Sequence, residues 1–86
     1  MRITRTESFA RDFAKLPAEV QERVVKALRL LVADPRHPSL QVKKMQPKIL
    51  GIFEGRVSQG YRMTFTVARE EIVLRRVGTH DILRTP

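Results

Sequence analysis

Apolar positions in the first third of the chain repeat with the spacing of an α-helix. After Thr6, a first stripe of apolar residues has the spacing i, i+4 and i+7. Thr6 itself suits the N-cap of a helix, because a threonine hydroxyl accepts a hydrogen bond from a backbone N–H of the first turn. A second stripe runs from Pro17 to Ala33 and stops at Asp34-Pro35, since proline ends a helix. The two stripes consist of Phe9, Phe13 and Leu16, then Val20, Val24, Leu28 and Leu31. We therefore predict a short strand at Met1 to Arg5, followed by a helical hairpin.

The pattern changes in the last third of the chain, where three segments are rich in β-branched and aromatic residues. These segments are Leu50 to Ser58, Tyr61 to Ala68 and Ile72 to Thr79. The short connections Gln59-Gly60 and Arg69-Glu70 predict an antiparallel meander, and Arg36 to Lys48, which has no clear period, is expected to be a basic loop. The chain is thus expected to form one α+β domain, residues 1–86, in the order β-α-α-β-β-β. The helical hairpin should pack on one face of an antiparallel sheet and leave the other face partly open.

Alternation along each strand predicts which side chains lie on the open face, because successive residues point to opposite faces. In the middle strand, the apolar set is Tyr61, Met63, Phe65 and Val67. This set should pack on the helices, which leaves Arg62 on the open face beside Glu54 and Arg56 of the preceding strand. In the last strand, Val73 and Val77 are assigned to the core. Arg76 and His80 then lie on the open face, with Gly78 as the position that would allow a bulge.

The charge balance narrows the class of partner. Seventeen Lys and Arg residues against nine Asp and Glu give a net charge of +8 and an isoelectric point near 11.1, which favours binding to a polyanion. The chain has no cysteine and only two histidines, so neither a disulfide nor a metal ion is expected, and no motif predicts a cofactor. No segment approaches the roughly 18 apolar residues of a membrane span. The N-terminal residues lack the apolar region of a secretory signal, so we expect no membrane partner and a cytoplasmic location.

Several motifs occur in a recognisable order along nearly the whole chain. They are the helical pair ending at Ala33-Asp34-Pro35, the loop Lys43-Lys44-Met45, the strand Gly51-Ile52-Phe53-Glu54-Gly55-Arg56-Val57, the run Tyr61-Arg62-Met63-Thr64-Phe65, and the ending Val77-Gly78-Thr79-His80-Asp81. This ordered set resembles the RelE/ParE toxin superfamily, and the Tyr-Arg run inside a β meander is its most specific element. The chain departs from the pattern in one respect: Ile82 and Leu83 stand where many members have a tyrosine that stacks on the substrate base.

The resemblance implies the toxin of a type II toxin–antitoxin pair. Such a toxin is a ribosome-dependent, metal-independent endoribonuclease, an mRNA interferase, which cleaves mRNA in the decoding site and so inhibits translation. Its partners would be the ribosome with its mRNA and a cognate acidic antitoxin, with which a monomeric toxin forms a hetero-oligomer. The residues that the family uses correspond here to Lys43 or Lys44 in the loop before the second strand, Arg62 in the Tyr-Arg run, and His80 near the C-terminus.

Metal-free cleavage of RNA needs a base for the 2′-OH proton, cations for the charge on the phosphate, and an acid for the leaving 5′-oxygen. Glu54 and His80 are the base and acid candidates, and the guanidinium groups of Arg56 and Arg62 suit a phosphate clamp. The candidate catalytic residues are therefore Glu54, Arg62 and His80, and the candidate substrate-binding residues are Lys43, Lys44, Arg56 and Arg76.

Other interpretations of the same residues stay open. Glu54 can simply form an ion pair with Arg56 or Arg62, and His80 can bond Asp81 at a strand end. A ParE-like relative would poison DNA gyrase and cleave no RNA. A non-catalytic basic protein would bind nucleic acid in a salt-sensitive way without cleaving it, and an inactive homologue would only assemble with its antitoxin.

Overall fold

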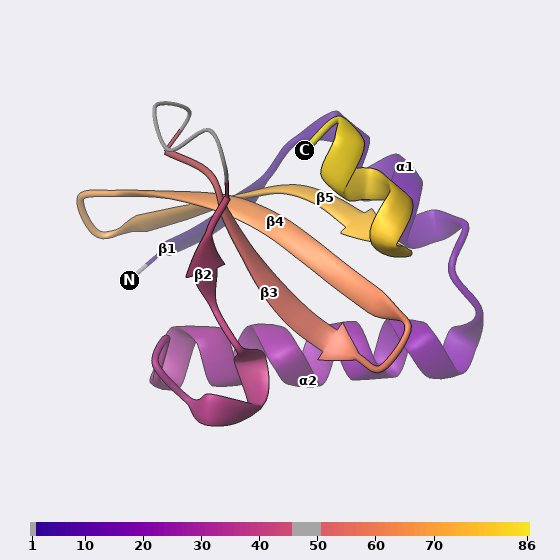
Figure 1. Ribbon diagram of the computed structural model, residues 1–86, viewed down its shortest axis with the longest axis horizontal. Coiled ribbons are helices and arrows are strands. Elements are labelled where there is room, and N and C mark those ends of the chain that lie inside the picture. Colours follow the sequence, from indigo (N-terminus) through magenta and orange to yellow (C-terminus); the bar gives the residue numbers. More distant parts are fainter. Residues whose placement is uncertain (1, 46–50) are drawn as a thin grey trace.

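The computed structural model describes residues 2–45 and 51–86 of the chain (Figure 1). Its elements, in chain order, are β1 (Arg2–Arg5), α1 (Glu7–Ala14), α2 (Ala18–Ala33), the 3₁₀ helix η1 (Pro38–Leu40), β2 (Lys43–Lys44), β3 (Phe53–Ser58), β4 (Tyr61–Ala68), β5 (Glu71–Gly78) and the 3₁₀ helix η3 (His80–Arg84). The predicted α+β class and the helical hairpin are confirmed, and the predicted order β-α-α-β-β-β is found with one additional short strand, β2, before the last three. Leu50, where the second strand was predicted to begin, lies outside the described residues.

Local chemistry explains where the two helices begin. The Thr6 hydroxyl accepts from the N–H of Phe9 at 3.1 Å, which confirms the predicted N-cap, and it donates to the carbonyl of Arg75 in β5 at 2.8 Å. Pro17 precedes the first turn of α2 and fixes the extended backbone there. The Gln21 amide then donates to the carbonyl of Phe13 at 2.8 Å, so a side chain of α2 ties the two helices together.

The sheet has five strands in the order β1-β5-β4-β3-β2. β2, β3, β4 and β5 form antiparallel pairs, which confirms the meander, but β1 pairs with β5 in parallel, so the sheet is mixed rather than wholly antiparallel. Lys43 and Lys44 lie in the two-residue strand β2, in the segment expected to be a loop. Figure 1 shows α2 running along one side of the sheet and η3, in yellow, beside the end of β5.

The core lies between the sheet and the two helices. It contains Phe9 of α1, Val20, Val24, Ala27 and Leu31 of α2, Leu40 of η1, Met63 and Phe65 of β4, and Ile72, Leu74 and Val77 of β5. Val25 and Val32 lie outside it, with 40% and 44% of their surfaces exposed, although their spacing widens the apolar stripe of α2. The fully buried Phe65 stacks on Phe53 with ring centroids 5.8 Å apart, which joins β3 to this core.

A bulge in β5 changes which side chains of that strand face the helices. Thr64 pairs with Arg76 and the next residue, Phe65, pairs with Leu74, so Arg75 is the extra residue. Ile72 and Leu74 on one side of the bulge, and Val77 on the other, are therefore all buried in the core. The assignment of Val73 to the core is thus wrong, because the bulge falls at Arg75 rather than at Gly78. The placement of Arg76 on the opposite face is confirmed.

Candidate functional site

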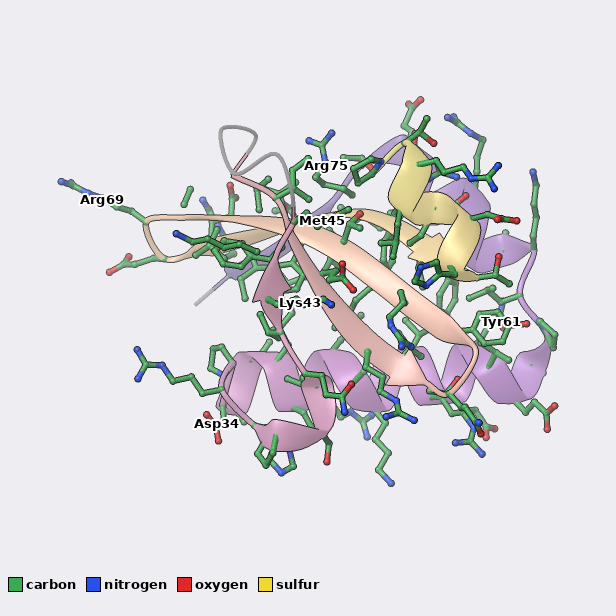
Figure 2. All side chains as sticks on the ribbon, in the orientation of Figure 1. Asp34, Lys43, Met45, Tyr61, Arg69 and Arg75 are labelled. Carbon is green, nitrogen blue, oxygen red and sulfur yellow. The ribbon has the colours of Figure 1, made fainter. Side chains whose placement is uncertain are left out.

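A row of polar side chains crosses the sheet on the face opposite the core. Successive strand pairings join Lys43 to Glu54, Glu54 to Thr64, and Thr64 to Arg76. Directly paired residues point to the same face, so these four side chains form one row over β2, β3, β4 and β5. Lys43 lies near the middle of the molecule in this view (Figure 2). Lys44 pairs with Phe53, whose ring packs against the core, so Lys44 points to the other face and lies apart from this row.

A second row lies next to the first, toward the β3–β4 turn. Arg56 pairs with Arg62, and Arg62 pairs with Gly78. The Nη1 group of Arg62 donates to the carbonyl of Ser58 at 3.0 Å and to that of Tyr61 at 3.2 Å. These two bonds hold the guanidinium at the turn, at one end of the row.

Glu54 belongs to the same face as Arg56 and Arg62, as alternation predicts, and all three side chains are partly buried. Among residues 2–45 and 51–86, however, no ion pair within 4.0 Å involves Glu54. The simple ion pair of Glu54 with either arginine is therefore not found. Lys43, its direct neighbour on β2, is the cation that the pairing places opposite it.

The C-terminal segment covers part of the sheet face opposite the core. The sequence did not predict this packing. A side-chain carbon at Gly78 would lie 2.9 Å from Cγ2 of Ile82, so η3 packs directly on this end of β5. Thr64 is fully buried, and its hydroxyl donates to the carbonyl of Pro86 at 3.1 Å. The exposed part of the face is consequently a strip over β2, β3 and the start of β4. We call Lys43, Glu54, Arg56 and Arg62 the basic strip.

His80 begins η3, two residues after Gly78, the pairing partner of Arg62. The predicted last strand, which was to end at Thr79, ends at Gly78, and His80 stands at the turn into the helix rather than on the sheet. The imidazole is exposed, and the described residues provide it with neither a hydrogen bond nor an ion pair to Glu54, Arg62 or Asp81. His80 thus lies two residues from the pairing partner of Arg62, and the described residues show no hydrogen bond or ion pair between it and the basic strip.

Arg76 is engaged by an acid that the sequence analysis missed. Its Nε and Nη2 donate to the two carboxylate oxygens of Asp12 in α1, at 2.7 and 3.1 Å, and its Nη1 donates to the carbonyl and hydroxyl of Thr85, each at 3.1 Å. Asp12 also accepts from the N–H of Val77 at 3.2 Å. We call this group the Asp12–Arg76 clamp, because it joins α1, β5 and the C-terminal segment. Its donors are occupied within the protein, which leaves Arg76 outside the basic strip.

The clamp shifts the ionisation of both partners. Burial alone would raise the pKa of Asp12, but hydrogen bonds from Arg76 and Val77, with the charges of Arg76 and Lys15, outweigh it and hold that pKa below its ordinary value of 3.8. The hydrogen bond to Asp12 in turn raises the pKa of Arg76. Asp12 lies three positions after Phe9, a residue of the apolar stripe, and is therefore close to the buried side of α1. An acid at such a position is the feature of the sequence that could have predicted a buried partner for Arg76.

Two further findings concern other classes of site. Within the part of the chain that the structure describes, no group of three or more His, Asp or Glu side chains is placed to hold a metal ion. Over the same residues, no helix is long and apolar enough to cross a membrane.

Comparison with known proteins identifies the class of fold. No family model and no curated protein matches the chain. Among solved structures, a YoeB/ParE toxin from Agrobacterium tumefaciens has a TM-score of 0.78 and 15% identity, over 93% of this chain and 99% of that one. YafQ from E. coli strain BL21(DE3) has a TM-score of 0.77 and 18% identity, over 96% and 98%. The RelB–RelE antitoxin–toxin complex from Methanococcus jannaschii has a TM-score of 0.75 and 17% identity, over 95% of both chains.

The chain therefore has the fold of bacterial and archaeal toxins that belong to toxin–antitoxin systems. More narrowly, the fold is the one found in solved toxins named RelE, YafQ and YoeB/ParE, which is the fold that the ordered motifs of the sequence predicted. Identities of 15–18% to these three structures leave the activity to be argued from this chain's own residues.

Proposed function

We propose that this protein is the toxin of a toxin–antitoxin pair and that it cleaves mRNA on the ribosome without a metal ion. The observation that carries the proposal is the basic strip. It places one carboxylate, Glu54, among a lysine and two arginines on the exposed part of a sheet face, on a fold whose solved examples are toxins. A ribosomal target would place the protein in the cytoplasm.

The chemistry assigns a role to each group. Glu54 takes the proton of the 2′-OH, the 2′-oxygen forms a bond to phosphorus, and the bond between phosphorus and the 5′-oxygen breaks. His80 gives a proton to that leaving oxygen. The products are a 2′,3′-cyclic phosphate and a 5′-OH end. Guanidinium groups bind phosphate oxygens in pairs, so Arg56 and Arg62 would stabilise the charge that builds up on the phosphate.

The remaining predicted residues take other roles. Lys43, opposite Glu54, contacts the flanking RNA backbone, and Lys44 contacts RNA or ribosome from the other face of β2. Arg76 was predicted to bind substrate. Because its guanidinium already bonds Asp12 and Thr85, we assign it instead to positioning η3, and with it His80.

The test is to induce the gene and map the 5′ ends of cellular mRNA. Wild type should arrest growth and give cuts in register with codons. Glu54→Gln and His80→Ala should lose most of these cuts, because one acid–base group contributes about 10²–10⁴-fold to rate. Arg62→Ala should lose most of them because the charge on the phosphate is no longer stabilised. Glu19→Gln and Arg69→Ala are matched controls, since both lie on exposed surface away from the strip. Full toxicity and cleavage in the Arg62 and His80 variants would refute the assignment.

The proposed partner is an acidic antitoxin segment. The net charge of +8 favours such a segment, and an apolar cleft of about 530 Å³ between β1, α1 and α2 gives it a second kind of contact. Ile3, Phe13 and Leu28 are among the residues that line this cleft. The toxin itself is proposed to be a monomer before the antitoxin binds. Co-expression with the neighbouring gene, followed by size-exclusion chromatography, should give a hetero-oligomer.

A second candidate is a basic protein that binds nucleic acid without cleaving it. It is favoured by one observation: in the described residues no hydrogen bond or ion pair links Glu54, Arg62 and His80. The induction experiment separates the candidates, because this one predicts intact mRNA and no growth arrest. A gyrase poison of the ParE kind would give a DNA-damage response with intact mRNA.

A further inference from the structure

A small cleft opens at the edge of β3, on the side of the sheet where α2 and η1 pack. Its volume is about 220 Å³, and it is lined by Arg23, Lys26, Ala27, Leu30, Ser39, Leu40, Arg56 and Val57. Three of these eight residues are cations, and none is an acid. In the described part of the chain, no carboxylate lies within 4.0 Å of the charged groups of Arg23, Lys26 or Arg56.

The cleft combines this charge with an apolar floor. Leu40 and Ala27 are buried core residues, with 1% and 5% of their surfaces exposed. Walls of low dielectric constant focus the field of charges of one sign, so the potential inside such a cleft exceeds that over a flat basic surface. The Ser39 hydroxyl adds a neutral hydrogen-bond donor or acceptor. This chemistry selects a compact anion with several acceptor oxygens.

The size of the cleft limits the ligand. Sites for whole small molecules usually have about 300–1,000 Å³, and this cleft is smaller. A single phosphate group with its linking oxygens fits such a space, whereas an enclosed nucleotide cofactor does not.

Arg56 connects the cleft with the basic strip. It pairs with Arg62 on the sheet face, and the same residue is also one of those that line the cleft. Among the described residues, β2 pairs with β3 only at Phe53 and Glu54, so no described strand covers the β3 edge at Arg56. Arg56 thus belongs both to the basic strip and to the lining of the cleft, in which the other two cations, Arg23 and Lys26, come from α2.

We infer that the cleft between α2, η1 and β3 binds a backbone phosphate of the same RNA strand that lies on the basic strip, so that the strand turns around the β3 edge onto Arg23 and Lys26. The inference rests on the proposed ribonuclease function and extends it, since it assigns a second anchoring point outside the reacting phosphate. Such a contact fixes the position of the strand and carries no base specificity.

The test measures binding of the full chain to a 2′-O-methyl RNA oligonucleotide, which lacks the 2′-OH and is not cleaved. Affinity is measured by fluorescence anisotropy from low to high salt for wild type and for Arg23→Gln/Lys26→Gln. Each phosphate contact on a single strand contributes about 0.7 to the slope of log K against log salt. The double variant removes this one phosphate contact, so it should reduce the magnitude of the slope by about 0.7 and weaken binding most at low salt.

The control is Arg29→Gln/Arg69→Gln, which removes the same charge from exposed positions outside the cleft. Arg69 lies at the far tip of the β4–β5 hairpin (Figure 2). Circular dichroism checks that both variants fold. An equal loss of slope in both would mean that only net charge matters, and this would overturn the inference. An unchanged slope in the cleft variant would also overturn it.

Ribosome cleavage assays on the same proteins separate this failure from failure of the proposed function. If wild type cleaves mRNA and binds the oligonucleotide but the cleft variant behaves like wild type, only the cleft assignment fails. If wild type neither binds nor cleaves RNA, both assignments fail.

Discussion

Replacing Asp12 with alanine should destabilise the protein far more than the loss of a surface acid would. The change removes the acceptor of three hydrogen bonds, two from Arg76 and one from the N–H of Val77. The Asp12 and Arg76 side chains are only 16% and 28% exposed, so water replaces these bonds poorly. Hydrogen bonds to charged groups contribute about 1.5–3 kcal/mol, and truncating one partner of a fully buried ion pair costs about 3–5 kcal/mol.

For this partly buried pair we expect a loss of about 2–3 kcal/mol. A domain of this size has a free energy of unfolding of roughly 4–13 kcal/mol, so the loss is a large part of it. Each kcal/mol corresponds to about 4–8 °C in Tm for a domain of 60–100 residues, which predicts a decrease of about 10–20 °C. Thermal unfolding followed by far-ultraviolet circular dichroism measures the effect.

Glu7→Ala is the matched control, because Glu7 also pairs with an arginine, Arg11, but both side chains are exposed. Exposed pairs contribute about 0–1 kcal/mol, so Tm should change by only a few degrees. A double-mutant cycle of Asp12→Ala with Arg76→Ala isolates the pair itself. If Asp12→Ala unfolds within a few degrees of the Glu7 variant, or if the coupling is below about 0.5 kcal/mol, the reasoning about the clamp is wrong.

Three further predictions concern the packing of η3, the clamp and the basic strip. Gly78→Ala should lower Tm and speed amide exchange in η3, since the added carbon lies 2.9 Å from Ile82; unchanged exchange would contradict this packing. The pKa of Asp12 in the folded protein lies below its ordinary value of 3.8, so in acid the unfolded chain binds more protons than the folded chain does. The stabilisation that the clamp provides should therefore be lost as pH falls from about 5 towards 2. The Tm difference between wild type and Asp12→Asn should shrink over that range, and a constant difference would count against it. In a purified ribosome assay, Glu54→Gln should slow cleavage by about 10²-fold or more, whereas an unchanged single-turnover rate would remove Glu54 from the mechanism.

Periodicity predicted the parts of the fold that depend on local pattern. The helices from Thr6 to Ala33 and the strand from Tyr61 to Ala68 follow from one apolar face and its spacing. Alternation likewise brought Glu54 and Arg62 to one face, as the register shows. Their catalytic roles stay predictions, because alternation fixes the direction of a side chain and not its chemistry.

The features that were missed depend on residues far apart in the chain. The parallel pairing of β1 with β5 joins segments about 70 positions apart, and alternation within a strand contains no information about its neighbour. Asp12 and Arg76 are separated by 64 positions. The bulge at Arg75 reverses the alternation partway along β5, which is why Val73 was assigned to the core. The segment His80–Arg84 is too short to show a helical period, so its packing on the sheet was not predicted.

The bulge also indicates where this chain tolerates a change of length. Without Arg75, strict alternation would still direct Ile72, Leu74 and Val77 towards the helices, whereas deletion of Val73 would turn Ile72 outwards or displace the residues after it. A homologue one residue shorter at this point can therefore keep the same interior. It would lose the bond from Arg75 to the carbonyl of Pro86 and hold its C-terminal segment through one arginine instead of two. Alignments of related chains should accordingly place a single-residue gap here, accompanied by variable C-terminal sequences.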